Sequence, residues 1–119
     1  MVASPTTSKS GCAISGLFDL EPVRLCYLND VVKMDAETAR RNSPLHHLPV
    51  RGVPLIALVG GDETDEFIRQ NATFAAAWQA KGYPCQERIA PGRNHFTIMH
   101  ALGDRADPHT QALLALMGL

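Results

Sequence analysis

The continuously apolar run VPLIALV, residues 53–59, places the strongest constraint on how this 119-residue chain can fold. An apolar run of this length, followed directly by Gly60 and Gly61, is typical of a strand buried on both faces. Strands of this kind occur in parallel sheets that helices cover on either side. The run is also far shorter than the roughly 20 residues needed to span a membrane. We therefore expect a protein of the α/β class.

Two other segments favour strands, and three favour helices between or after them. GCAIS, residues 11–15, is short and apolar, and CQERIA, residues 85–90, alternates weakly. Helices are predicted over residues 31–41 and 64–81, and from Pro108 to about Gly118 with Asp107 as the N-cap. The resulting order, in which each strand is followed by a helix, predicts a parallel sheet with right-handed crossovers.

Three parallel strands make a thin sheet for a protein that must bury both of its faces. We therefore expect residues 11–119 to be the C-terminal part of a single, larger α/β domain. Residues 1–10 are polar and are predicted to be a loose leader. An uncovered sheet edge would leave unpaired backbone groups, so self-association through that edge is expected.

The net charge and the cysteine content indicate which partners and which cellular location to expect. Eleven basic and twelve acidic residues give a net charge of −1, so we expect neither nucleic acid nor a membrane as partner. The first ten residues lack the charged and apolar regions of a signal peptide. Cys12, Cys26 and Cys85 are an odd number without metal-binding spacing. They predict reduced thiols, no metal site and a cytoplasmic protein.

Two loops that follow predicted strands carry groups capable of acid–base chemistry. The loop after residue 59 holds four carboxylates, and the loop after residue 90 holds His95; the carboxylates are Asp62, Glu63, Asp65 and Glu66. In open parallel sheets, functional groups collect in such loops. A carboxylate followed by a histidine is the order of acid and base in an α/β-hydrolase triad. A purely structural role stays open for both kinds of residue, since acidic residues also favour helix N-termini and loop histidines are often structural.

Several sequence blocks resemble those of one enzyme family, in the same order. They are AISGLFDLEPV, YLND, SPL, VPLIALVGGDETDEFIRQ, FAAAW and PGRNHFTIM, which together cover roughly residues 11–119. These blocks are similar to the C-terminal part of the arylformamidase-like, or kynurenine formamidase-like, α/β-hydrolases. The resemblance implies a serine hydrolase of the esterase/lipase group that cleaves aryl formamides or small esters and uses no metal or organic cofactor.

The resemblance also implies roles for individual residues. The acid of the family stands three residues before an EF pair, which is formed here by Glu66 and Phe67, so Glu63 is the implied acid. Its neighbour Asp62 is the alternative. The histidine of the family's NHF block corresponds to His95.

The chain departs from the family at the nucleophile. None of its serines or cysteines lies in a G-x-S-x-G type elbow, and no HGG stretch is present. Ser15, which is followed by Gly16, is interpreted as structural. We therefore expect a hydrolase fragment that is inactive alone. The alternative is a non-catalytic α/β module, either a truncated gene product or a fragment that acts only by pairing with another chain.

Overall fold

The computed structural model describes residues 9–119, and its strands form one parallel sheet. The strands are β1 (Gly11–Ile14), β2 (Leu55–Gly60) and β3 (Cys85–Ala90), in the order β1-β2-β3. Gly11 pairs with Leu55, and Leu55 pairs with Cys85. The carboxyl ends of all three strands therefore lie at the same edge of the sheet. The predicted α/β class and the parallel arrangement are confirmed, although β1 ends before Ser15 and β2 begins at Leu55 rather than at residue 53.

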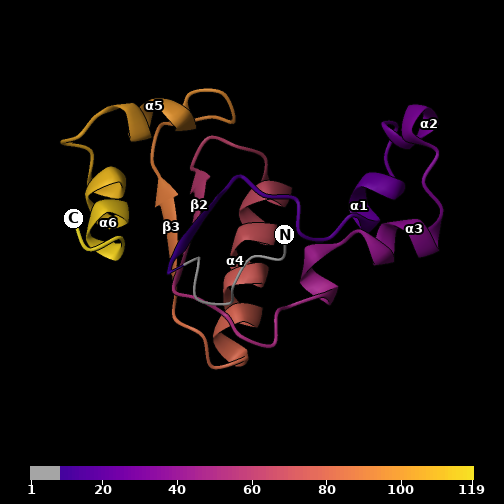
Figure 1. Ribbon diagram of the computed structural model, residues 1–119. Helices are drawn as coiled ribbons and strands as arrows, with labels where there is room; N and C mark the ends of the chain where they lie inside the picture. Colours follow the sequence, from indigo (N-terminus) through magenta and orange to yellow (C-terminus); the bar gives the residue numbers. More distant parts are fainter. Residues whose placement is uncertain (1–8) are drawn as a thin grey trace, which may run out of the picture.

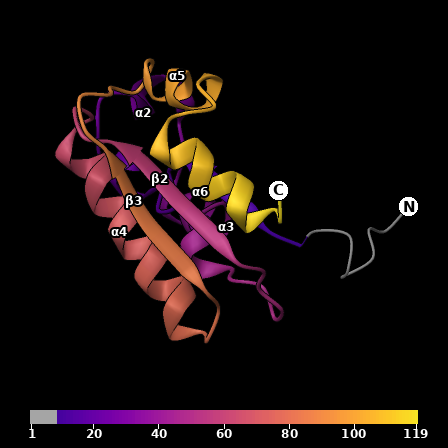
Figure 2. The same ribbon diagram turned by 90° about the vertical axis from the view of Figure 1, so that its left-hand side faces the viewer.

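Helices cover both faces of the sheet. Seen along the sheet in Figure 2, α4 (Asp65–Ala80) lies on one face and α6 (Pro108–Leu116) on the other. The side chains of β2 alternate between two buried clusters. Ile56 and Leu58 pack with Ile98, Leu113 and Leu116 on the α6 side. On the α4 side, the aromatic cluster consists of Phe18, Phe74 and Trp78, with Leu55 and Cys85 packed against it.

The two long helices begin and end where their sequences indicate. Asp107 caps α6, since its Oδ1 accepts a hydrogen bond from the His109 N–H at 2.8 Å, and Pro108 occupies the first turn. Acidic residues occupy the first turn of α4, where they interact favourably with the helix dipole. Gly82, with φ of +88°, follows α4 in the left-handed conformation that glycine tolerates best.

The single helix predicted over residues 31–41 is wrong, because the structure has two short helices there. They are α2 (Asn29–Val32) and α3 (Ala36–Arg41), and Lys33 between them adopts a left-handed φ of +56°. The Asp35 side chain accepts a hydrogen bond from the Thr38 N–H at 2.7 Å and thereby caps α3. Asp35 is therefore the N-cap of a new helix rather than an internal residue of a longer one.

The remaining short elements were not expected from the sequence. They are α1 (Glu21–Arg24), the 3-10 turn η1 (Pro44–His46) and α5 (Ile98–Gly103). Figure 1 shows that α1, α2 and α3 gather beside α4, away from α6. Most of the predicted leader, residues 1–8, lies outside the described residues. Within residues 9–119, no helix has the length and apolar character required to cross a membrane.

Candidate functional site

The loops that follow β2 and β3 bring a carboxylate and an imidazole into direct contact. Glu63 lies in the turn between β2 and α4, and His95 lies in the loop between β3 and α5. Glu63 Oε1 and His95 Nδ1 are 2.7 Å apart. Because an ionised carboxylate can only accept hydrogen bonds, Nδ1 carries the hydrogen in this contact. The structure thus joins the two residues that the sequence singled out.

The carboxylate of Glu63 is fully buried and is held by donors on both of its oxygens. Its side chain is 0% exposed. Oε1 accepts from His95, and Oε2 accepts from the Ser15 hydroxyl at 2.5 Å and from the Gly60 N–H at 2.7 Å. A buried charge is costly unless hydrogen bonds compensate for its lost hydration. Three donors provide this compensation here.

These donors also determine the ionisation of Glu63. Burial raises the pKa of this carboxyl, but the hydrogen bonds from Ser15, Gly60 and His95 oppose burial and leave the pKa below its ordinary value. Glu63 is therefore a carboxylate at neutral pH. A carboxylate that is charged at neutral pH and contacts Nδ1 is the arrangement that orients an imidazole and stabilises its protonated form.

Backbone contacts fasten the two loops to each other. The Gly61 N–H donates to the Ala90 carbonyl at 2.8 Å, and the Asp62 N–H donates to the Arg93 carbonyl at 2.9 Å. Gly60 is packed so closely that a Cβ there would lie 2.3 Å from the Arg93 carbonyl oxygen. The distance between Glu63 and His95 therefore depends on rigid backbone contacts at the ends of β2 and β3.

Asp62, the alternative acid, does not reach the histidine. Its side chain is exposed, and it joins the loop contacts through its backbone N–H. Glu63 is thus the carboxylate that the fold directs to His95.

The imidazole of His95 is half-exposed, with 49% of its side chain accessible, and it borders a cavity of about 200 Å³. The Phe67 ring lies 4.8 Å from the imidazole, measured between ring centroids. Among residues 9–119, the polar contact recorded for the ring is made through Nδ1. Nε2 is therefore the ring nitrogen left to exchange a proton with another group.

A second, mostly apolar cavity of about 220 Å³ adjoins the first. The two cavities share Thr64 and Phe67, so the Phe67 ring is a common wall. The rest of the second cavity is lined by Leu17, Pro22, Val23, Cys26, Leu28, Glu66 and Gln70. An apolar group could therefore be bound beside the half-exposed imidazole.

Glu63 has a further side-chain partner in Ser15. The role of this serine was not predicted from the sequence. It is 9% exposed and follows β1 at the same sheet edge. The signal in the sequence was its position as the last residue of the predicted strand 11–15, at the same sheet edge as the loops of Glu63 and His95. Its hydroxyl donates to Glu63 Oε2 and not to His95, which does not fit the role of a nucleophile.

Cys12 and Cys85 also lack the features of a nucleophile. Burial raises the pKa of both the Cys12 and the Cys85 thiols, which disfavours the reactive thiolate. Within the part of the chain that the structure describes, no group of three or more His, Cys, Asp or Glu side chains could hold a metal ion.

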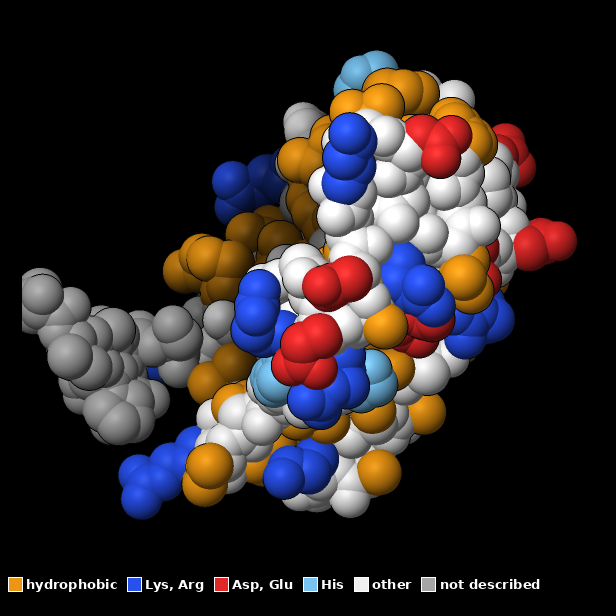
Figure 3. All heavy atoms as spheres, turned by 90° about the vertical axis from the view of Figure 1, so that its right-hand side faces the viewer, with side chains coloured by type: hydrophobic (Ala, Val, Ile, Leu, Met, Phe, Trp, Pro, Cys, Tyr) orange, Lys and Arg blue, Asp and Glu red, His pale blue; other side chains and the backbone are white. Residues whose placement is uncertain are grey.

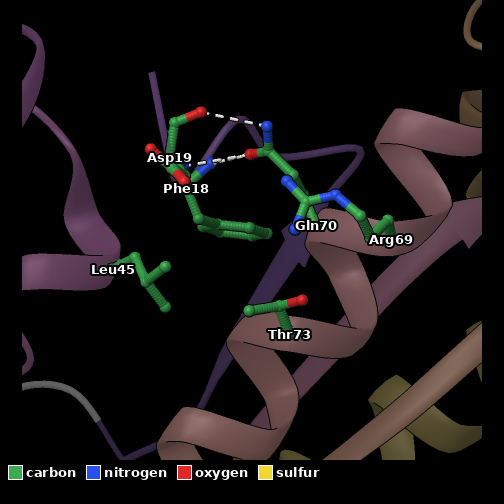
Figure 4. A pocket seen from close by; sticks show the side chains of 6 residues that line it. All are labelled: Phe18, Asp19, Leu45, Arg69, Gln70 and Thr73. Carbon is green, nitrogen blue, oxygen red and sulfur yellow. Dashed lines mark hydrogen bonds between the residues drawn. The ribbon is translucent and has the colours of Figure 1, made fainter. Parts of the chain in front are cut away.

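A smaller cavity of about 40 Å³ lies between α4 and the Phe18–Asp19 segment, and Gln70 is one of the residues that line it. Figure 4 shows the Gln70 amide bridging this segment. Gln70 Oε1 accepts from the Phe18 and Asp19 N–H groups at 2.8 and 3.0 Å, and Nε2 donates to the Asp19 carbonyl at 2.9 Å. Gln70 thus fastens α4 to a neighbouring loop. The cavity holds no pair of groups comparable to Glu63 and His95.

The chain is similar in sequence to two curated enzymes. It is 30% identical to the kynurenine formamidase of Salmo salar over 92% of its own length, and 30% identical to that of Danio rerio over the same share. It spans only 40% and 39%, respectively, of the length of these relatives. No protein-family model matches the chain.

Solved structures with the same fold include a candidate thioesterase from Silicibacter sp. TM1040. That structure superposes on 93% of this chain with a TM-score of 0.75 and 28% identity, and 39% of its own length is covered. Thermogutta terrifontis esterase 2 superposes on 93% of the chain with a TM-score of 0.58 and 18% identity, with 39% of its length covered. The latter similarity concerns the fold alone. The chain is therefore similar, in sequence and in fold, to the C-terminal part of the arylformamidase-like α/β-hydrolases.

Proposed function

We propose that Glu63 and His95 are the acid and base of a serine-hydrolase triad that cleaves aryl formamides or small esters. The observation that carries the proposal is the 2.7 Å contact between a fully buried carboxylate and a half-exposed imidazole. The chain has no serine in a G-x-S-x-G elbow. The proposed nucleophile is therefore a serine contributed by a segment that is not part of this sequence.

In the proposed mechanism, the nucleophilic hydroxyl is hydrogen-bonded to His95 Nε2. His95 takes the proton as the serine oxygen attacks the formamide or ester carbonyl, and Glu63 stabilises the resulting imidazolium. The imidazolium then protonates the departing amine or alcohol, which leaves a formyl- or acyl-serine. A water molecule, deprotonated by His95, attacks the carbonyl carbon of this intermediate. The bond to the serine oxygen then breaks, the imidazolium returns the proton to that oxygen, and formic or carboxylic acid is released. These steps use side chains and one water molecule, and the proposal includes no metal or organic cofactor.

The apolar cavity beside His95 supports a substrate with an aromatic or aliphatic group next to its carbonyl. The Phe67 ring contacts the imidazole and also lines this cavity, so a substrate bound there would lie next to the base. The similarity to kynurenine formamidases favours the formamide, and the similarity to the candidate thioesterase favours an activated acyl ester. The three free cysteines favour a reducing compartment, so a cytoplasmic location forms part of the proposal.

The test compares the purified chain with a version joined at its N-terminus to a segment that carries an HGG stretch and a G-x-S-x-G elbow. Both are assayed with a p-nitrophenyl ester and with N-formylaniline. We expect no turnover above background from the chain alone, because an imidazole without a positioned nucleophile provides little catalysis. The completed version should turn over substrate and lose this activity on the His95→Ala substitution.

Two outcomes would contradict the proposal. Turnover by the chain alone that disappears on His95→Ala would mean that Ser15 or Cys12 acts as the nucleophile. A well-folded completed version without activity on either substrate would favour the non-catalytic module, which acts only by pairing with another chain.

A further inference from the structure

The hydroxyl of Ser15 contacts the oxygen of Glu63 that His95 does not use. Ser15 Oγ donates to Glu63 Oε2 at 2.5 Å, and the Gly60 N–H donates to the same oxygen at 2.7 Å. The other oxygen, Oε1, is 2.7 Å from His95 Nδ1. One carboxylate oxygen is therefore held by the fold, and the other is directed to the base.

Because its two oxygens have different hydrogen-bond partners, the Glu63 carboxylate cannot rotate freely. A half-turn of the Glu63 carboxylate about the bond to its Cγ only exchanges two equivalent oxygens. At angles in between, the oxygen at the Oε2 position would lose both of its donors inside a fully buried environment. Buried acceptors without donors are strongly disfavoured. With Ser15 in place, the orientation that points Oε1 at Nδ1 is therefore the favoured one. If the Ser15 hydroxyl were removed, the Gly60 N–H would be the one donor left on Oε2 to resist the rotation.

The backbone at Ser15 indicates that this placement is specific. Ser15 has a φ of +49°, a left-handed conformation that is uncommon for any residue other than glycine. Its N–H donates to the Leu58 carbonyl at 2.8 Å, which ties the end of β1 to β2. Unfavourable backbone conformations that persist in a fold are concentrated at functional sites. Here the conformation brings the hydroxyl onto Glu63.

We propose that Ser15 is a positioning residue, whose hydroxyl fixes the Glu63 carboxylate so that Oε1 remains on Nδ1 of His95. The inference rests on the proposed function, since it assigns Ser15 to the same acid–base pair. Ser15 acts through Glu63 and does not touch the substrate. Its role is to keep the imidazole in the tautomer that has its hydrogen on Nδ1 and its lone pair on Nε2.

The test measures the His95 tautomer by ¹⁵N NMR of the imidazole in the full 119-residue chain. The Nδ1–H tautomer should dominate in the unmodified chain. Ser15→Ala and Ser15→Gly both remove the hydroxyl, and glycine also tolerates the left-handed backbone. In both variants the Nε2–H tautomer should gain population. The titration of the Glu63 carboxyl, followed by its ¹³C shift, should move to higher pH.

Ser43→Ala is the matched control, because Ser43 is also a buried serine with a structural hydroxyl. Its Oγ accepts from the Leu20 N–H at 2.8 Å and donates to the Ala39 carbonyl at 2.6 Å. This variant should lose stability without changing the His95 tautomer. The amide spectrum of β2 reports whether each variant is folded.

The outcomes separate this inference from the proposed function. If Glu63→Gln changes the His95 tautomer and a folded Ser15→Gly chain does not, the positioning role of Ser15 is overturned while the acid–base pair stands. If neither substitution changes the tautomer, Glu63 does not orient His95, and the proposed function fails as well.

Discussion

Glu63 combines burial, charge and three hydrogen-bond donors in one residue, so a change of a single atom there has a specific consequence. In Glu63→Gln, the amide oxygen would take the place of Oε2, since that site receives two donors from Ser15 and Gly60. The amide NH₂ would then face His95 Nδ1. Two donors cannot pair, so the imidazole is expected to shift its hydrogen to Nε2 and lose its ability to accept a proton there.

The expected result is a dominant Nε2–H tautomer in Glu63→Gln, measured by ¹⁵N NMR. In an enzyme completed with a nucleophile, the same change should lower kcat by roughly 10⁴, the effect known for the corresponding amide substitution in a serine-protease triad. Asp62→Asn is the control, because Asp62 is exposed and uses only its backbone N–H in the loop contacts. A larger loss of activity in Asp62→Asn would show that the acid is Asp62.

The lowered pKa of Glu63 also predicts how stability depends on pH. Because the pKa of this carboxyl is lower in the folded than in the unfolded chain, ionised Glu63 stabilises the fold. This contribution is complete above the ordinary pKa of 4.5 and is lost as the pH falls through the lower, folded-state value. The difference in Tm between the unmodified chain and Glu63→Gln should therefore be large at pH 7 and should shrink in strong acid.

Glu37→Gln provides the control for this pH experiment. It removes the same charge from a side chain that is 65% exposed and lies 3.6 Å from Arg40. Exposed ion pairs of this kind contribute little to stability, about 0–1 kcal/mol. Its Tm difference should be small at pH 7. Equal Tm differences for the two variants would contradict the stabilising role of Glu63.

At the scale of the elements, the end of β2 has little space for a larger side chain. A Cβ at Gly60 would lie 2.3 Å from the Arg93 carbonyl oxygen and 3.1 Å from Glu63 Oε2. Since the first of these neighbours is backbone, Gly60→Ala must displace the loop that carries His95. Overpacking of this kind typically costs about 1–3 kcal/mol of unfolding free energy.

We expect Gly60→Ala to lower the unfolding free energy by an amount of that order in urea denaturation, and to perturb the His95 ring resonances. Gly61→Ala is the matched control, because a Cβ at Gly61 would find its nearest neighbour at 3.3 Å, close to ordinary contact. It should have a smaller effect on both measurements. Similar losses in the two variants would mean that the close approach at Gly60 does not position the loop.

The elements also show which parts of the fold the sequence could predict. The strands were predictable because β2 is continuously apolar and glycines end it, and α6 was predictable from Asp107 and Pro108. The break between α2 and α3 was not, since the composition of residues 31–41 is helical throughout. It depends on a local competition in which Asp35 caps a new helix and Asn29 bonds both backbone groups of Met34.

The same contrast applies to the site. Glu63 and His95 could be singled out because each follows a strand of one parallel sheet and because the surrounding blocks resemble a known family. The hydrogen bond of Ser15 to Glu63 could not be predicted, although Ser15 ends a predicted strand, since it joins residues 48 positions apart and depends on one left-handed backbone angle. A periodic pattern reveals which residues share a sheet edge, but not which hydrogen bonds form there.

In the molecule as a whole, the sheet has two outer strands, β1 and β3, and within residues 9–119 each has an edge that no other strand pairs. Within the described residues, β1 pairs only with β2 and occupies one end of the strand order. Large apolar side chains are also exposed near α1 and α2, among them Leu25, Tyr27, Leu28, Val31 and Val32. On the face shown in Figure 3, acidic and basic side chains lie close together with apolar side chains between them. Because the net charge of the chain is only −1, charge repulsion between copies is weak.

We predict that the isolated chain self-associates through β1 and these apolar side chains, because unpaired strand edges and apolar patches invite pairing. Sedimentation velocity should show dimers or larger species whose fraction rises with concentration. The N–H groups of Gly11 and Ser15 donate to carbonyls at β2, so the N–H of Cys12 points to the open edge. Cys12→Pro should therefore reduce the association, since proline removes that donor. A clean monomer with a sharp, cooperative melt would contradict the prediction and would favour a self-standing module.

Each of the three adjacent strands supplies one part of the acid–base site: Ser15 follows β1, Glu63 follows β2, and His95 follows β3. Neighbouring strands in any sheet lie about 4.8 Å apart, a spacing fixed by backbone hydrogen bonds rather than by side chains. The alignment of hydroxyl, carboxylate and imidazole is thus inherited from the sheet. The long crossover between β1 and β2 can therefore change in length and sequence, and with it the groups that meet a substrate, while the acid–base geometry is preserved.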